Sequence, residues 1–163
     1  MKPILVQMAN PPWTLQAIHF ACAMARNHGT TVILLRLMPV HHPNYLGESY
    51  GGCMPTPKED DALREYEATA EDYGVEFVIQ PMQSAATLSA IVDAAEQLDV
   101  EMVFAYIASS RVPFWEKLQT WWLTHQLAAA HRQLFTLARL PHANQPAPLV
   151  ITESEGRVLH SDV

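Results

Sequence analysis

Short apolar runs alternate along the chain with longer segments in which apolar residues recur every three or four positions. Runs of strand length cover residues 4–9, 31–38, 75–80, 102–107 and 133–139. The first run is stopped by Asn10-Pro11-Pro12 and the second by Pro39, and proline cannot continue a central strand. These runs therefore predict five buried strands.

The segments between the runs predict four helices, over residues 14–28, 57–73, 88–98 and 114–130. Thr14 is the expected N-cap of the first helix, and Gly29 stands where a left-handed residue ends it. The second helix begins with Thr56-Pro57-Lys58-Glu59, a capping box with proline at the first helical position. In the fourth helix, one side collects Phe114, Leu118, Trp121 or Trp122, His125 and Ala129.

Strands that alternate with helices are typical of a parallel sheet with right-handed crossovers. We therefore expect an α/β fold, an open five-stranded parallel sheet with helices on both faces, over residues 1–140. Residues 141–163 form an extension, in which a proline-rich linker precedes a β-hairpin formed by residues 149–152 and 157–160. Because a lone hairpin is marginally stable, it should lean on the body, a second copy or a partner.

Length and composition fit a single folded domain. The chain has 163 residues, of which 49% are hydrophobic and 17% charged, and this is enough for a full core. No apolar run reaches the roughly 18 residues of a transmembrane helix, and the first run is too short for a signal peptide. Cys22 and Cys53 provide no disulfide framework. We therefore expect a cytoplasmic protein that does not insert into membranes.

The charge of the chain is acidic and unevenly distributed. The net charge of −7 makes nucleic acid an unfavourable partner. Residues 59–101 carry twelve acids and one base, Arg64, whereas residues 102–145 carry one acid, Glu116, and four bases. Two such zones could guide self-association or partner choice. Alternatively, the acids line the solvated outer faces of the helices.

One candidate ligand site is the crevice beyond the carboxyl ends of the strands, where open parallel sheets bind ligands. Asn10 follows the first strand there, and Ser109, Ser110 and Arg111 follow the fourth. Backbone donors, two hydroxyls and a guanidinium would suit an anion. Alternatively, Ser110 caps the fourth helix and Arg111 pairs with an acid or water. None of the six glycines is placed to form a phosphate-binding loop.

Metal binding and nucleophilic catalysis find little support in the sequence. His41 and His42 are neighbours and Cys53 follows eleven residues later, which is not a metal-ligand spacing, so no metal is expected. No activating base accompanies Cys53, Ser109 or Ser110, so no catalytic residue is assigned.

Three tryptophans lie within eight residues of the fourth helix: Trp115, Trp121 and Trp122. They either pack against the helix's own sheet or form an exposed aromatic patch. An exposed patch would mark a surface for a protein partner.

The order of elements over residues 4–139 resembles the universal stress protein family. Ile4-Leu5-Val6 and residues 15–21 are similar to the first strand and helix of that family, and residues 91–95 and 98–103 to its third helix and fourth strand. The resemblance implies a sheet with strand order 3-2-1-4-5.

The resemblance extends to one branch of the family. ATP-binding members carry an Asp at the end of strand one and a Gly-x2-Gly-x9-Gly-Ser/Thr motif after strand four, but Ala9, Ala105 and Ala108 stand at the first three of these positions here. Residues 113–118 instead resemble the Phe-Trp-x-Lys-Leu stretch of the branch typified by the bacterial universal stress protein A, which does not bind ATP. The resemblance thus implies no cofactor and disfavours ATP and AMP.

The resemblance also implies a small cytoplasmic homodimer. The fifth strand would supply an otherwise unpaired sheet edge to the second subunit through Leu134, Phe135, Thr136 and Leu137.

We therefore expect a non-catalytic stress-response or adaptor protein that acts through dimer and partner contacts. The alternative is a sensor that binds an adenine nucleotide or another anion at Asn10, Ser109, Ser110 and Arg111. An enzyme of the related adenine nucleotide hydrolase superfamily would need a phosphate loop that the sequence lacks.

Overall fold

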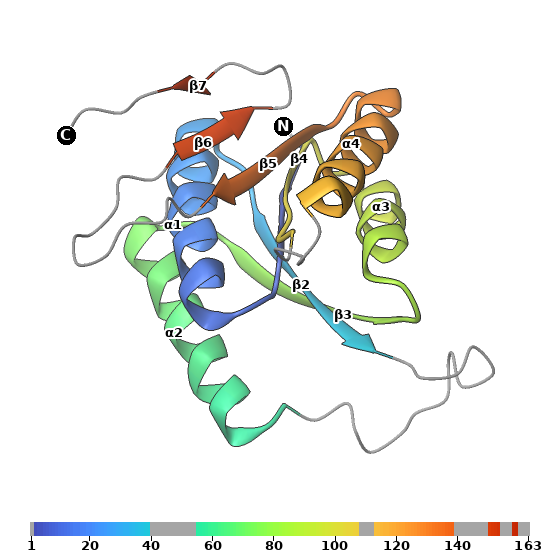
Figure 1. The fold of residues 1–163 in the computed structure, drawn as a ribbon. Coiled ribbons are helices and arrows are strands. Elements are labelled where there is room, and N and C mark those ends of the chain that lie inside the picture. Colours follow the sequence, from blue (N-terminus) through green and yellow to red (C-terminus); the bar gives the residue numbers. More distant parts are fainter. Residues whose placement is uncertain (1, 40–54, 108–112, 139–149, 154–157, 160–163) are drawn as a thin grey trace, which may run out of the picture.

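The computed structural model describes residues 2–39, 55–107, 113–138, 150–153 and 158–159 (Figure 1). The elements in chain order are β1 (Ile4–Gln7), α1 (Pro11–His28), β2 (Val32–Pro39), α2 (Pro57–Tyr73), β3 (Phe77–Ser84), α3 (Thr87–Gln97), β4 (Met102–Phe104), α4 (Pro113–Ala129), β5 (Gln133–Ala138), β6 (Val150–Glu153) and β7 (Val158–Leu159). All five predicted strands and all four predicted helices are present.

The strands form one sheet in the order β3-β2-β1-β4-β5-β6-β7. The pairs from β3 to β5 are parallel, and β6 and β7 are added in antiparallel orientation. The predicted α/β fold with strand order 3-2-1-4-5 and a C-terminal hairpin is therefore confirmed. β3 is longer than expected and contains Pro81, which an edge strand tolerates.

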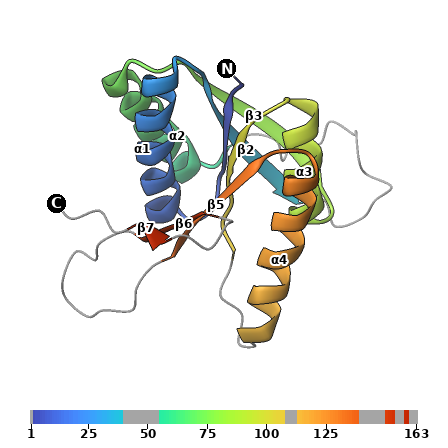
Figure 2. The ribbon, with the colours of Figure 1, turned by 90° about the horizontal axis from the view of Figure 1, so that it is seen from above.

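Helices cover both faces of the sheet, with α1 and α2 on one face and α3 and α4 on the other (Figure 2). Side chains of β1 alternate between two hydrophobic clusters, as the period of a strand requires. Ile4 and Val6 belong to the cluster under α1 and α2, whereas Leu5 belongs to the cluster under α3 and α4. β1 thus contributes side chains to both hydrophobic clusters.

The first helix begins earlier than predicted. Its N-cap is Asn10, whose side chain accepts a hydrogen bond from the backbone N–H of Trp13 at 3.1 Å. The expectation of an N-cap at Thr14 is wrong, because Pro11 and Pro12 fit the first helical turn, where an N–H is not needed. Thr14 lies inside the helix, and its buried hydroxyl donates to the carbonyl of Asn10 at 3.0 Å.

The second helix begins as predicted. The Thr56 side chain accepts from the backbone N–H of Glu59, and the Glu59 carboxylate accepts from the backbone N–H of Thr56. The helix ends at Gly74, which adopts the left-handed conformation with φ 68°. The capping box and the glycine therefore fix both ends of α2.

The edge of β5 is occupied within the chain. Residues of β6 pair with those of β5 from Phe135 opposite Glu153 to Ala138 opposite Val150. The expectation that Leu134, Phe135, Thr136 and Leu137 form an otherwise unpaired edge is therefore wrong, because the C-terminal hairpin leans on the body and supplies the neighbouring strand. A homodimer remains a prediction, but in this arrangement it cannot use that edge without displacing β6.

No helix of the described residues combines the length and the apolar character that crossing a bilayer requires.

Candidate functional site

The order of the sheet reverses at β1, which lies between β2 and β4. Ligands of such sheets bind beyond the carboxyl ends of the strands at this reversal. Gln7 is the last residue of β1, and its side chain is only 6% exposed. Its Oε1 atom accepts a hydrogen bond of 2.8 Å from the backbone N–H of Tyr106, just after β4. The side chain of Gln7 therefore bridges the two strand ends.

Two aromatic rings pack together at the same edge. Trp13, in the first turn of α1, is buried, and its ring meets that of Tyr106 edge-on at a centroid distance of 5.3 Å. Both side chains join the hydrophobic cluster under α1 and α2. Protein side chains therefore occupy the ends of β1 and β4 in the described part of this edge.

The N-terminus of α1 offers an anion few donors. Pro11 and Pro12 have no N–H, and the N–H of Trp13 is held by the side chain of Asn10. The N–H of Thr14 donates to the carbonyl of Asn10, and that of Ala9 donates to the Thr14 hydroxyl. Asn10, a predicted site residue, is thus engaged as a helix cap. The other three, Ser109, Ser110 and Arg111, lie outside the described residues.

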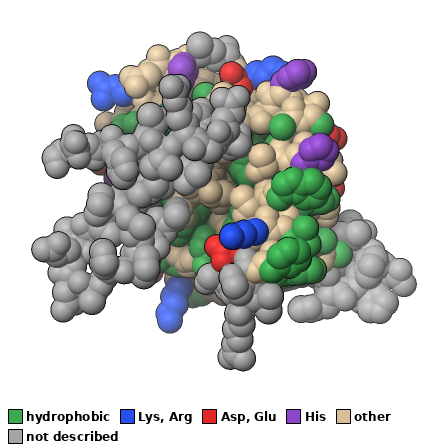
Figure 3. All heavy atoms as spheres, turned by 45° about the horizontal axis from the view of Figure 1, so that its top comes forward, with side chains coloured by type: hydrophobic (Ala, Val, Ile, Leu, Met, Phe, Trp, Pro, Cys, Tyr) green, Lys and Arg blue, Asp and Glu red, His purple; other side chains and the backbone are tan. Residues whose placement is uncertain are grey.

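The outward side of α4 carries a second candidate site. Large hydrophobic side chains are exposed there: Phe114 by 70%, Trp115 by 53%, Leu118 by 38% and Trp121 by 63%. We call these four residues the α4 surface. Figure 3 shows large hydrophobic areas on the side of the molecule where α4 lies. The ring of Trp121 stacks on that of His125, with centroids 5.6 Å apart and planes 8° apart.

The third tryptophan faces differently. Trp122 is half-buried and packs against the cluster under α3 and α4, where Leu123 and Leu127 are fully buried. Of the three tryptophans that the sequence offers as a partner surface, Trp115 and Trp121 are exposed, whereas Trp122 packs inward. Phe114 and Leu118 belong to the same exposed surface but are not among the sequence candidates. Helical spacing places Leu123 and Leu127 on the side opposite Phe114 and Leu118, but it does not show which of the two sides meets the sheet.

The sequence matches no protein-family model and no curated protein. Among solved structures, a universal stress protein in complex with cAMP superposes with a TM-score of 0.62 at 13% identity, over 84% of this chain and 97% of that one. A universal stress protein from Archaeoglobus fulgidus superposes with a TM-score of 0.57 at 16% identity, over 83% and 93% of the two chains. The fold is that of the universal stress proteins. At these identities, the similarity shows the fold alone.

Three alanines stand where ATP-binding universal stress proteins carry their motif residues, and the structure describes two of them, Ala9 and Ala105. Ala105 is buried in the cluster under α3 and α4, and its backbone N–H donates to the carbonyl of Phe135 at 3.1 Å. Ala9 is half-buried beside the cluster under α1 and α2. Both backbone N–H groups are therefore already paired within the protein, whereas Ala108 lies outside the described residues.

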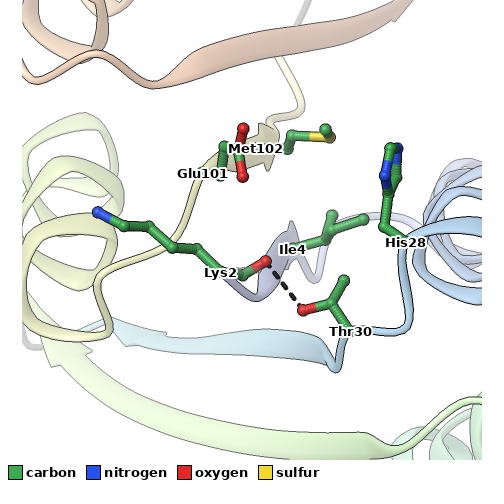
Figure 4. A pocket seen from close by; sticks show the side chains of 6 residues that line it. All are labelled: Lys2, Ile4, His28, Thr30, Glu101 and Met102. Atoms are coloured by element: carbon green, nitrogen blue, oxygen red, sulfur yellow. Dashed lines mark hydrogen bonds between the residues drawn. The ribbon is translucent and has the colours of Figure 1, made fainter.

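A small pocket lies at the opposite, amino edge of the sheet (Figure 4). It has a volume of about 40 Å³ and is lined by Lys2, Ile4, His28, Thr30, Glu101 and Met102. The Thr30 hydroxyl donates to the carbonyl of Lys2 at 2.9 Å, and the Lys2 ammonium pairs with Asp99 at 2.7 Å. Ligand pockets measure roughly 300–1,000 Å³, so this one is suited to ordered water.

The described residues offer neither a metal centre nor an activated thiol. No three His, Cys, Asp or Glu side chains gather there as metal ligands would. Burial raises the pKa of the Cys22 thiol to about 11, which keeps it protonated at neutral pH. His41, His42 and Cys53, whose spacing in the sequence is not that of metal ligands, lie outside the described residues.

Proposed function

We propose that this chain belongs to the universal stress protein family, to the branch that does not use ATP, and that it is a non-catalytic cytoplasmic protein acting by contact with other polypeptides. The observation that carries this proposal is the exposure of Phe114, Trp115, Leu118 and Trp121 on one helix. Aromatic residues are enriched in the cores of protein interfaces, and soluble monomers rarely expose several of them together. The contacts would include self-association and a further protein partner in a stress response.

The carboxyl edge of the sheet supports the non-catalytic part of the proposal. Gln7, Trp13 and Tyr106 fill the ends of β1 and β4, and the backbone donors of Ala9 and Ala105 are used within the protein. A phosphate that bound to these backbone groups would have to replace their hydrogen bonds, at the cost of leaving protein groups unpaired.

A capture experiment tests the function. The purified chain is immobilised, exposed to extracts of stressed and unstressed cells of its source, and the retained proteins are identified by mass spectrometry. We expect specific partners that the Trp121→Ser variant retains poorly. Gln126→Ser, which changes another exposed residue of α4, is the matched control. Equal capture by both variants, or capture of nothing, would contradict the proposal.

The second candidate function is a sensor of an adenine nucleotide or another anion. It is favoured by one comparison, because a universal stress protein with the same fold is in complex with cAMP. The ligand would bind near Asn10, Ser109, Ser110 and Arg111. Equilibrium dialysis against cAMP, AMP and ATP decides between the two candidates. Saturable binding at micromolar ligand supports the sensor, and absence of binding at millimolar ligand eliminates it.

A further inference from the structure

The outward side of α4 carries exposed residues at the spacing by which one helix packs against another. Phe114, Leu118 and Trp121 are separated by four and three residues, and His125, whose ring stacks on that of Trp121, follows four residues later. Such spacing places the four side chains in one row along the helix, which we call the α4 row. The row is about 17 Å long, or about three helical turns, so it fits a helix of similar length.

Acidic side chains lie on the neighbouring helix. α3 lies beside α4 on the same face of the sheet (Figures 1 and 2), and buried side chains of both helices form one hydrophobic cluster. Ile91 and Ala95 of α3 are fully buried in this cluster, whereas Asp93 and Glu96 are exposed on the opposite side of the helix. Because α3 and α4 both turn their buried sides to the sheet, these acids and the α4 row belong to the same outward layer of the molecule.

The charge of this layer is negative on the side of α3. α3 carries Asp93 and Glu96 but no base, and neither carboxylate forms an ion pair or hydrogen bond with another described residue. On α4, the charges of Glu116 and Lys117 offset each other. Arg132, just after α4, donates from its Nε to a backbone carbonyl at 3.1 Å. The two acids of α3 are thus available to a positive charge from outside the chain.

Complementarity of charge identifies the class of partner that fits. A basic segment brings positive side chains to Asp93 and Glu96, and the net charge of −7 attracts it from a distance. A second copy of the chain would bring a second pair of these acids to the contact, which favours it less. Helices packed side by side lie about 8–10 Å apart, so a lysine or arginine on a helix laid along α4 can reach the acids of α3.

We propose that the α4 row and the two acids of α3 dock a basic amphipathic helix of another protein. The apolar side of that helix lies on Phe114, Leu118 and Trp121. Its lysines or arginines face Asp93 and Glu96. The proposal rests on the proposed function, in which the chain acts by contact with other polypeptides, and it names the chemistry of the partner.

The size of the apolar contact sets the expected affinity. A fully buried aromatic side chain contributes about 150–250 Å², so the exposed fractions of Phe114 and Trp121 together leave roughly 200–330 Å² in solvent. This area is small beside the roughly 800 Å² that each partner buries in a standard interface. We therefore expect a transient complex with a micromolar dissociation constant.

Fluorescence anisotropy of labelled model peptides, added to the full-length protein, tests this docking site. The first peptide has about 18 residues, with leucine at positions a and d of each heptad and lysine at the others. The second has glutamate in place of lysine, and the third has the composition of the first in scrambled order. We expect micromolar binding of the first peptide, weakened by added salt, and binding of the other two that is weaker by about tenfold or more.

Variants of α4 test the apolar part of the docking site. Trp121→Ser should raise the dissociation constant of the first peptide by about 30-fold or more, as loss of a central aromatic contact does. Gln126→Ser, at an exposed position of α4 outside the row, is the matched control and should leave it unchanged. Circular dichroism shows whether each variant is folded.

A double variant of α3 tests the charged part. Asp93→Asn with Glu96→Gln should raise the dissociation constant by about three- to tenfold and make binding less sensitive to salt. Glu67→Gln with Asp72→Asn removes the same two charges from exposed positions of α2, on the other face of the sheet, and should change binding little.

Four results would overturn the inference. They are absence of binding of the basic peptide, equal binding of the acidic or the scrambled peptide, an equal loss of affinity in the α2 and α3 double variants, and a dimer of the chain alone that Trp121→Ser dissociates. The fate of the proposed function is read separately. If proteins captured from extracts depend on Trp121 but are retained equally by Asp93→Asn with Glu96→Gln, the proposed function stands and only the basic class of partner is wrong. If the peptide binds as expected but the extracts yield no partner, the docking site stands and the proposed function fails.

Discussion

The Oε1 atom of Gln7 accepts a hydrogen bond of 2.8 Å from the backbone N–H of Tyr106, although the two residues are 99 positions apart in the sequence. Gln7 and Thr14 are buried polar side chains, and both lie where β1 leads into α1. Each is paired with backbone groups, as buried polar atoms require. The carboxyl edge of the sheet is thus held by internal hydrogen bonds.

Replacing Gln7 tests how much this bond contributes. Gln7→Leu keeps most of the side-chain volume but leaves the N–H of Tyr106 without its acceptor. We expect the free energy of unfolding to fall by about 1–3 kcal/mol, measured by urea denaturation. Gln16→Leu, on the exposed side of α1, is the control and should change stability little. If Gln7→Leu and Gln16→Leu change the free energy of unfolding equally, the hydrogen bond from Tyr106 to Gln7 does not stabilise the carboxyl edge of the sheet.

The cap of α1 gives a second prediction. Asn10 accepts from the N–H of Trp13, and the preceding helical positions are prolines without donors. Asn10→Ala leaves that N–H unpaired, so the free energy of unfolding should fall by about 1 kcal/mol. Asn10→Asp should retain the cap, and Asn27→Ala, near the other end of the helix, should have little effect. A stable Asn10→Ala variant would mean that water caps the helix equally well.

The sequence was informative where structure depends on local spacing. Thr56, Pro57 and Glu59 stand within one turn, so their capping box was readable. The start of α1 was misjudged because both Asn10 and Thr14 are capable N-caps, and the two prolines between them fit a first turn as well as a loop.

The candidate sites depended on information that spacing does not carry. Periodicity shows that α4 is apolar on two sides but not which side meets the sheet, so Phe114 and Leu118 were left out of the exposed surface. The pairing of β6 with β5 spans the linker and is decided by the whole sheet, so it was not readable from β5 alone. The bond from Gln7 to Tyr106 likewise depends on the parallel pairing of β1 with β4.

A third prediction concerns a buried hydroxyl. Tyr66 of α2 is buried, and its hydroxyl has no hydrogen-bond partner among the described residues. Burial raises the pKa of Tyr66, and nearby Thr14 opposes this shift without reaching hydrogen-bond geometry. Tyr66→Phe removes the unpaired group and should increase the free energy of unfolding by about 1 kcal/mol.

The matched variant for this test is Tyr73→Phe. The Tyr73 hydroxyl lies 3.3 Å from Nδ1 of His19, so its removal should lower stability by about 0.5 kcal/mol. Thermal unfolding of Tyr66→Phe and Tyr73→Phe distinguishes an unpaired hydroxyl, whose removal stabilises the fold, from a hydrogen-bonded one, whose removal destabilises it. A Tyr66→Phe variant less stable than the parent would show that the Tyr66 hydroxyl is paired in the folded protein.

The capping box of α2 makes stability depend on pH. The Glu59 carboxylate accepts from the backbone N–H of Thr56 at 2.8 Å and lies 3.6 Å from the Arg36 guanidinium. The bond from the Thr56 backbone lowers the pKa of Glu59; partial burial opposes this, and the Thr56 side chain and the Arg36 charge add to the lowering. Because the folded pKa is below the unfolded one, Glu59 stabilises the fold at pH values above about 4.3, and this contribution is lost as pH falls through the folded pKa.

The variant Glu59→Gln isolates this contribution, since glutamine can still accept from the Thr56 N–H but does not titrate. At pH 7 we expect it to be less stable by about 0.5 kcal/mol, a small value because more than a third of the Glu59 side chain is exposed and solvent screens its charge. The difference should shrink as the pH falls below about 4.3 and vanish once the folded parent carboxyl is protonated. Glu67→Gln, at an exposed position later in α2, controls for the loss of one negative charge. If Glu59→Gln is still less stable than the parent by the same amount at low pH, the loss of stability arises from packing and not from the charge of the carboxylate.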